Sequence, residues 1–336
     1  MRKYFSFQLL LIFKVSFLFI NINNVNGFIS PQIPLSKITL QSNANSNEST
    51  NLETIATERF PTSIEDQVRQ ATLALRAATS SSIHRHSIRL LLPLIGATEL
   101  DDWPGGAQQQ MEAAAPLVQS ILKQIPLDAK DRDGLSIQST IFEPVDGIQA
   151  LFAYNDENPQ KDSCSILLPT ADTVSKIQEL DVQVGPTRDL ILVNPEWRRP
   201  SDFSSSSPLL SFFSKDEKSK EIDYVETFYP TFVCSNLMVE GDQIRILRSY
   251  PGPWRVFLQI IENPTASTPD QMKIDWIEIG SKPVQETNNA ENSIIFDYGK
   301  PTYQEITNMI ESQDGYVPKS VTERAAAAFT FIKDTL

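Results

Sequence analysis

The sequence predicts an α/β fold in which a mostly parallel sheet is flanked by helices, with an antiparallel meander in the C-terminal half. This is a Rossmann-like three-layer arrangement. Two patterns predict it. Up to Val193, short apolar runs alternate with helical stretches, as in parallel strands joined by helices. From Tyr224 onward, apolar runs follow one another with only short turns between them, which is typical of antiparallel strands.

The first predicted helix extends from about Thr62 to Thr79. Thr62 and Glu65 have the spacing of a capping box, and apolar residues recur at helical intervals after them. Pro116 marks either a kink or the start of a second helix, because proline lacks the donor that a helix interior needs. The further predicted helices cover 111–125, 172–180 and 320–331.

The predicted strands are apolar runs that are too short for helices. They cover 87–93, 137–142, 163–168, 190–193, 228–234, 243–248 and 254–261. The turn formers Glu240-Gly241-Asp242 and Pro251-Gly252-Pro253 separate the last three strands, which therefore form the meander. The polar stretches 201–207 and 281–292 are predicted loops.

The charge of the chain excludes one class of partner. The 336 residues carry 29 cations and 42 acids, a net charge of −13. The first 27 residues hold three of the cations and no acid, so residues 28–336 have a net charge of −16. Because binding to phosphate backbones requires a basic surface, we expect no nucleic-acid partner.

The N-terminus has the composition of two targeting signals in series. Residues 1–27 have the cationic start and the short apolar run, Leu9 to Ile20, of a signal peptide, and this run is too short to span a membrane stably. Residues 28–58 form a transit-peptide-like segment and linker, poor in acids and rich in Ser and Asn as far as Asn47. We expect residues 59–336 to form a single α/β domain.

The junction Gly27-Phe28-Ile29-Ser30-Pro31 resembles the bipartite presequence of algae with complex plastids, in which an aromatic residue begins the transit segment. The resemblance implies import through the endoplasmic reticulum into the chloroplast stroma. Secretion is the alternative, although the two cysteines of the chain are few for a secreted protein. We expect no transmembrane anchor after processing.

Motifs for common cofactors and nucleophiles are absent from the sequence. It contains neither Gly-x-Gly-x-x-Gly nor Gly-x-x-x-x-Gly-Lys-Ser/Thr, and Gly105-Gly106 is the nearest approach to a phosphate loop. No Gly-x-Ser-x-Gly nucleophile elbow is present. We therefore expect no cofactor.

The histidines and cysteines leave two weaker alternatives open. His84 and His86 would lie on one face of a strand that began early, but a third metal ligand is not evident, so no metal site is predicted. Cys164 and Cys234 each lie in an apolar run and are expected to be small buried side chains, with a redox pair as the alternative.

A candidate cleft is predicted at the carboxyl ends of the strands, where open α/β sheets bind ligands. Its residues are acids, an amide, an aromatic residue and a cation that follow three of the predicted strands: Asp101, Asp102, Asp172, Asn194, Trp197 and Arg198. The alternative interpretation is structural. Asp102 and Asp172 would cap helices and Trp197 would fill the edge of the core, since aspartate favours capping positions.

Five motifs occur in order between Phe60 and Asp270. They are Pro-Thr-Ser-Ile-Glu-Asp-Gln (61–67), Arg-Leu-Leu-Leu-Pro (89–93), Leu-Ile-Leu-Val-Asn-Pro (190–195), Phe-Tyr-Pro-Thr-Phe-Val-Cys (228–234) and Tyr-Pro-Gly-Pro-Trp-Arg-Val-Phe (250–257). This stretch resembles a plastid family of unknown function found in plants and algae. That family includes the low-photosystem-II-accumulation assembly factor, and a related segment is fused to a chloroplast adenylate kinase. The resemblance supplies no catalytic residues that could be assigned to positions of this chain.

The resemblance favours a non-catalytic stromal protein that assists assembly or maintenance of the photosystems and thylakoids through contacts with a protein of the photosynthetic apparatus. Trp103, Trp197 and Trp254 are the expected contact anchors, because tryptophan is enriched at interaction hot spots. The alternative is a nucleotide- or metabolite-binding enzyme that uses the strand-end cleft. A structural domain without a ligand is a third interpretation that the sequence leaves open.

Overall fold

The computed structural model describes residues 59–92, 106–126, 134–197, 200–203, 215–262, 273–285 and 298–333. All of them belong to one compact unit, residues 42–336. The predicted signal peptide, 1–27, and transit-like segment, 28–58, lie outside the described residues.

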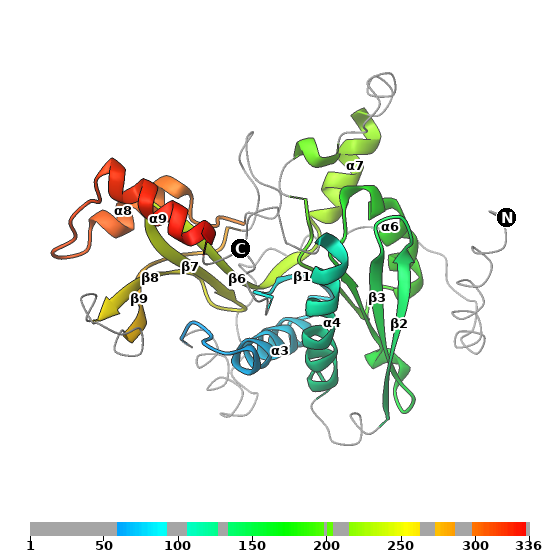
Figure 1. The fold of residues 1–336 in the computed structure, drawn as a ribbon. Helices are drawn as coiled ribbons and strands as arrows, with labels where there is room; N and C mark the ends of the chain where they lie inside the picture. The colour runs from blue at the N-terminus through cyan, green and yellow to red at the C-terminus, as the bar shows by residue number, and fades with distance from the viewer. Residues whose placement is uncertain are drawn as a thin grey trace. The chain divides into compact units, whose positions relative to one another are not determined.

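The described part of the chain forms one sheet of nine strands in the order β2-β3-β4-β5-β1-β6-β7-β8-β9 (Figure 1). The strands are β1 (Arg85–Arg89), β2 (Leu135–Glu143), β3 (Ile148–Asn155), β4 (Ser163–Leu167), β5 (Asp189–Val193), β6 (Tyr229–Val239), β7 (Asp242–Ser249), β8 (Trp254–Glu262) and β9 (Lys273–Lys282). The four central strands β4, β5, β1 and β6 are parallel. Every other neighbouring pair is antiparallel.

The fold is therefore α/β with a mixed sheet, and the prediction of a mostly parallel sheet is wrong. Three of the eight strand pairings are parallel and five are antiparallel. The predicted C-terminal meander is confirmed in β6 to β9. The error arose from β3, which the sequence analysis missed. It pairs with both β2 and β4 in antiparallel fashion and so removes β2 from the parallel part of the sheet.

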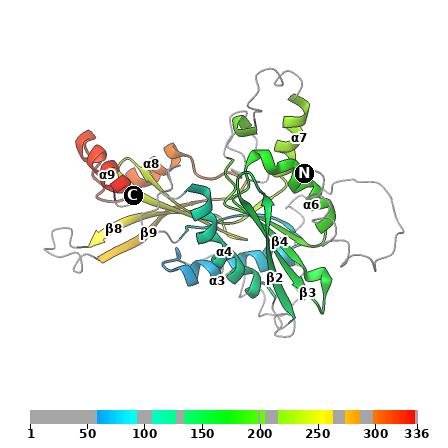
Figure 2. The ribbon, with the colours of Figure 1, turned by 45° about the vertical axis from the view of Figure 1, so that its right-hand side comes forward.

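Helices lie on both faces of the sheet. They are α3 (Ile64–Ser80), α4 (Gly106–Gln124), α6 (Val174–Val184), α7 (Lys215–Val225), α8 (Tyr303–Glu311) and α9 (Val321–Lys333). Helix α6 lies on the side of the sheet opposite to α3 and α4 in both views (Figures 1 and 2). Helix α8 packs on β6 and β9. No helix within the described ranges has the length and apolar character that crossing a membrane requires.

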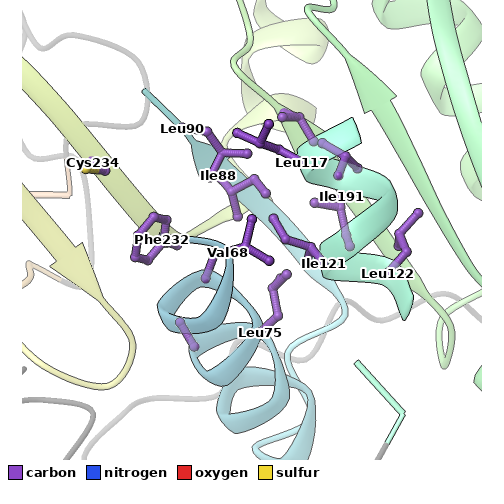
Figure 3. Packing of buried hydrophobic residues seen from close by; sticks show 14 of the residues in the cluster. Val68, Leu75, Ile88, Leu90, Leu117, Ile121, Leu122, Ile191, Phe232 and Cys234 are labelled. Atoms are coloured by element: carbon purple, nitrogen blue, oxygen red, sulfur yellow. The ribbon is translucent and has the colours of Figure 1, made fainter. Parts of the chain in front are cut away.

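The main core lies between α3, α4 and the centre of the sheet. In Figure 3, Val68 and Leu75 of α3 and Ile121 of α4 point toward Ile88 of β1 and Ile191 of β5. All five side chains are buried. Burying one such side chain contributes roughly 1.5–3 kcal/mol, so β1 is held by apolar contacts as well as by its strand partners.

Sequence and structure differ at several element boundaries for identifiable reasons. Helix α3 is capped by Ser63, whose hydroxyl accepts from the backbone N–H of Asp66 at 3.1 Å, one position beyond the predicted cap. Helix α4 continues through Pro116. Strands β3 and β9 and helices α7 and α8 were not predicted from the sequence. Asp146-Gly147 nevertheless marks the β2–β3 hairpin turn, and Thr302 with Glu305 forms a capping box at α8.

Candidate functional site

The residues of the predicted strand-end cleft have different surroundings. Asp172 is exposed in the short helix η3 (Ala171–Thr173) that follows β4, while Asn194 and Trp197 follow β5. Asp101, Asp102 and Arg198 lie outside the described residues. Among the remaining members, the recorded contacts of Asn194 and Trp197 are internal to the fold.

Asn194 joins the end of β5 to the end of β1. Its Oδ1 accepts from the backbone N–H of Leu90 at 2.7 Å, and its Nδ2 donates to the carbonyl oxygen of Leu90 at 3.0 Å. Gln67 of α3 makes the same pair of bonds with Leu91, both at 2.9 Å. Asn194 adopts a positive φ of 49°, a conformation that asparagine tolerates better than most residues. Two side-chain amides thus satisfy the backbone where β1 leaves the sheet.

The two described tryptophans that were expected to be exposed contact anchors are buried. Trp197 is 1% exposed and lies 5.8 Å from the ring of Phe203. Trp254 is also 1% exposed, and its Nε1 donates to the carbonyl oxygen of Tyr298 at 3.2 Å. The prediction that these side chains are contact anchors is therefore wrong, while the structural interpretation of Trp197 is confirmed. Trp103 lies outside the described residues.

A polar cluster lies at the opposite end of the parallel strands, around Asp189 at the start of β5. His84 Nδ1 lies 2.8 Å from Asp189 Oδ1, and Thr79 Oγ1 donates to Asp189 Oδ2 at 2.9 Å. His86 is fully buried. Its Nδ1 lies 2.9 Å from Thr231 Oγ1, and its Nε2 lies 3.5 Å from Asp189 Oδ1 without a hydrogen bond in the described part of the chain. The cluster joins α3, β1, β5 and β6.

This environment keeps Asp189 ionised. Burial raises the pKa of Asp189, but the contacts with His84, His86 and Thr79 more than offset burial and lower its pKa from 3.8 to about 2. A carboxylate with a lowered folded-state pKa stabilises the fold at pH values above its unfolded pKa. That stabilisation is lost as the pH falls from about 4 toward 2.

A second charged cluster lies on the other face of β1. The Arg85 guanidinium donates to the carbonyl oxygens of Arg188 and Gly185 at 2.9 and 2.7 Å, and it forms an ion pair with Asp181 of α6. The hydroxyl of Tyr224 in α7 donates to Asp181 Oδ2 at 2.9 Å. Burial raises the pKa of Tyr224, so this hydroxyl remains a donor. The cluster ties α6 and α7 to the start of β1.

Arg248 of β7 is a fully buried cation whose recorded partners are aromatic rings, a hydroxyl and a carbonyl group. It donates to the carbonyl oxygen of Gly252 at 2.5 Å and to the Tyr229 hydroxyl at 3.0 Å. Its guanidinium carbon lies 5.6 Å and 5.8 Å from the ring centroids of Tyr229 and Tyr250, within cation–π range. Burial lowers the pKa of Arg248. The cluster holds the cis peptide Tyr250–Pro251 against the start of β6.

The structure tests the two alternatives that the sequence left open, a metal site at the two histidines and a redox pair of the two cysteines. His84 and His86 do share a face, but both turn a nitrogen toward the same Asp189 oxygen. Within the described ranges, no group of three or more His, Cys, Asp or Glu side chains is arranged to hold a metal. Cys164 and Cys234 are buried, and no disulfide joins them. They lie on β4 and β6, and these two strands are three strand spacings or about 14 Å apart, so the cysteines cannot form a disulfide.

The chemistry available at Asp189 is that of an oriented imidazole. A carboxylate that binds Nδ1 fixes the tautomer and direction of His84, as the Asp and His members of a hydrolase triad do. The structure records no Ser, Thr or Cys hydroxyl or thiol bonded to His84 Nε2 among the described residues. Asp189 was not predicted as a site residue because it lies 105 positions from His84 in the sequence. The sequence could have indicated the contact with His84 in one way, because Asp189 begins a strand predicted to lie parallel to β1.

Comparison with protein families identifies the domain. The model of the family described as a domain of unknown function, DUF1995, matches residues 61–269. The chain belongs to the DUF1995 family. No curated protein matches the chain.

The DUF1995 match covers the same stretch as the five ordered motifs of the sequence. Three contacts link these motifs in space: Gln67 binds Leu91, Asn194 binds Leu90, and the ring of Tyr229 lies 5.7 Å from that of Tyr250. The five motifs therefore contribute residues that join strand ends and enclose Arg248.

We predict that Asn194→Gly lowers the free energy of unfolding by about 1–3 kcal/mol, because the backbone groups of the buried Leu90 lose both partners. Asn194→Ala should lose about 1 kcal/mol more, since alanine is strained at positive φ. Urea unfolding of the two variants separates the hydrogen bonds from the backbone strain. A neutral Asn194→Gly variant would contradict the bridging role.

We predict that Asp189→Asn removes a pH-dependent part of the stability. Urea unfolding of the natural chain should show the Asp189 contribution in full above pH 4 and a loss of about 2 kcal/mol as the pH falls to 2. The stability difference between the natural chain and Asp189→Asn should shrink by that amount over the same range. Asp172→Asn, at an exposed carboxylate, is the matched control and should retain the Asp189 contribution. A constant difference between the natural chain and Asp189→Asn from pH 2 to pH 5 would contradict the prediction.

Proposed function

We propose that this DUF1995 protein is a non-catalytic protein of the plastid stroma that assists assembly or maintenance of the photosystems and thylakoids through protein contacts. The observation that carries the proposal is the DUF1995 match over residues 61–269. The same stretch holds the five ordered motifs that resemble a plastid family with an assembly factor among its members.

The positions of the residues of the five ordered motifs support a role in contacts with a partner protein. Gln67, Asn194 and Tyr229 make bonds within the fold that hold strands together. A protein that acts through its surface needs a rigid body to present that surface, and these bonds supply rigidity. Since Trp197 and Trp254 are buried, the contacts must use other side chains.

The location forms part of the proposal and is supported by the sequence of residues 1–58. The cationic and apolar start followed by an acid-poor segment after Phe28 is the order expected of a protein that enters a complex plastid through the endoplasmic reticulum. The acidic body, with a net charge of −16 after residue 27, favours basic protein surfaces over nucleic acid as partners.

We predict that photosystem subunits co-purify with the tagged full-length protein. The purification is a gentle one from solubilised thylakoids of the organism that makes the protein. The expected yield exceeds that of an unrelated tagged stromal protein by about tenfold or more, because a specific contact survives mild washing. Recovery equal to this control would contradict the assembly role. Thermal stabilisation by nucleotides or sugar phosphates would instead support the alternative, an enzyme with a strand-end cleft.

We predict that residues 1–60 direct a fluorescent reporter into the plastid of an alga with complex plastids. Replacing Phe28 with alanine should retain the reporter outside the stroma, because the aromatic residue at the junction is the feature that these import systems recognise. Fluorescence microscopy of both fusions checks this. Replacement of the neighbouring Ile29 with alanine is the control and should leave import intact. Secretion of the unaltered reporter would contradict the location.

A further inference from the structure

Strand β2 ends the sheet on one side, and within the described residues its outer edge is protected only at its C-terminal end, where a bulge lies between Ile141 and Glu143 and Glu143 pairs with Lys176. No strand pairs with that edge in the described part of the chain, and Figure 1 shows β2 at the border of the sheet. The strand is nine residues long, and Leu135 to Phe142 include no charged residue and no proline. Natural sheets usually blunt such an edge with charges, prolines, bulges or a covering element.

The opposite border of the sheet shows this protection. Strand β9 carries Asp275, Glu278 and Lys282, and helix α8 packs against it. Glu278 pairs with Arg255 at 2.5 Å, and Lys282 pairs with Glu305 at 2.8 Å. The two borders of one sheet therefore differ in chemistry, and only β2 offers a long uncharged row of backbone groups among the described strands.

The side chains of β2 also favour an added strand. Ile137 and Ile141 lie on the same face because they are four positions apart in a strand. Ile137 packs partly on the main core, whereas Ile141 is 60% exposed. Val145, in the adjoining turn, is 89% exposed. An added strand would cover Ile141 with apolar residues at alternate positions.

The charged residues near the two ends of β2 indicate which kind of segment would pair with its outer edge. Asp146 is exposed in the turn after β2, and Asp156 and Glu157 are exposed beside Leu135, where β3 ends. We propose that the outer edge of β2 binds an extended segment of a partner protein by strand addition. That segment has apolar residues at alternate positions and positive charge at its ends. The inference rests on the proposed contact function and assigns it a surface and a partner chemistry.

A second copy of this chain fits the same edge less well. Antiparallel pairing of two β2 strands about Ser139 would bring Asp146 of one copy toward Asp156 and Glu157 of the other. Like charges in such positions oppose association, and each copy has a net charge of −16 after residue 27. Charge complementarity therefore favours a basic partner segment.

The test uses the full-length chain and a fluorescent nine-residue peptide, matched to the length of β2, in which isoleucine and threonine alternate between terminal lysines. Fluorescence anisotropy should detect binding stronger than about 1 mM, and hydrogen exchange should slow in β2 and not in β9. Methylating alternate backbone nitrogens of the peptide, or replacing its lysines with glutamates, should weaken binding by about tenfold or more.

The variant Ile141→Lys of the protein should weaken binding of the parent peptide by the same factor. Val182→Lys on α6, where Val182 is 83% exposed, is the matched control and should leave binding unchanged.

Four results would overturn the proposal. They are no binding of the parent peptide, equal binding of the methylated peptide, protection outside β2, and a dimer of the natural chain in sedimentation that Ile141→Lys abolishes.

Co-purification distinguishes the β2 assignment from the proposed assembly role. If Ile141→Lys recovers photosystem subunits as well as the natural chain does, the β2 assignment fails and the assembly role stands. If the peptide binds at β2 but no photosystem subunit is recovered, the assembly role fails and the β2 assignment stands.

Discussion

The whole sheet depends on β1, a strand of five residues that pairs with β5 on one side and β6 on the other. In the described part of the chain, it is the link between the N-terminal strands and the C-terminal meander. So short a strand supplies few ladder bonds, and side chains reinforce it at both ends. Asp189 and Arg85 hold its start, while Asn194 and Gln67 bond to the backbone just beyond its end. Since such bonds cost more to break when buried, they stabilise the sheet where its ladder is shortest.

This arrangement gives the residues of the five ordered motifs a structural role. Asn194 and Gln67 each pair with both backbone groups of a residue, as a neighbouring strand would. Tyr229 and Tyr250 provide the rings around a buried cation. Each side chain does what its position in the architecture demands. These motif residues therefore stabilise the fold, and the proposed contact function would use the surface that the fold presents.

The sequence predicted those elements whose signals are local and missed those that depend on distant partners. The apolar runs of β1, β4 and β5 and the capped, periodic α3 were evident because their patterns are complete within a few residues. Whether β2 pairs in parallel depends on β3, and the partner of His84 is 105 positions away. The burial of Trp197 and Trp254 was equally hidden, because tryptophan suits a core and a contact surface alike.

The alternation of side chains at the start of β1 constrains how the strand can be threaded. His84 and His86 face Asp189 on one side, and Arg85 faces Asp181 on the other. A slip of β1 by one residue would exchange the two faces. It would move Arg85 away from the backbone carbonyls of Gly185 and Arg188. It would also separate His84 from Asp189 and His86 from Thr231. The loss of these hydrogen bonds would add to the loss of apolar contacts, so the alternation of polar side chains disfavours the shifted register.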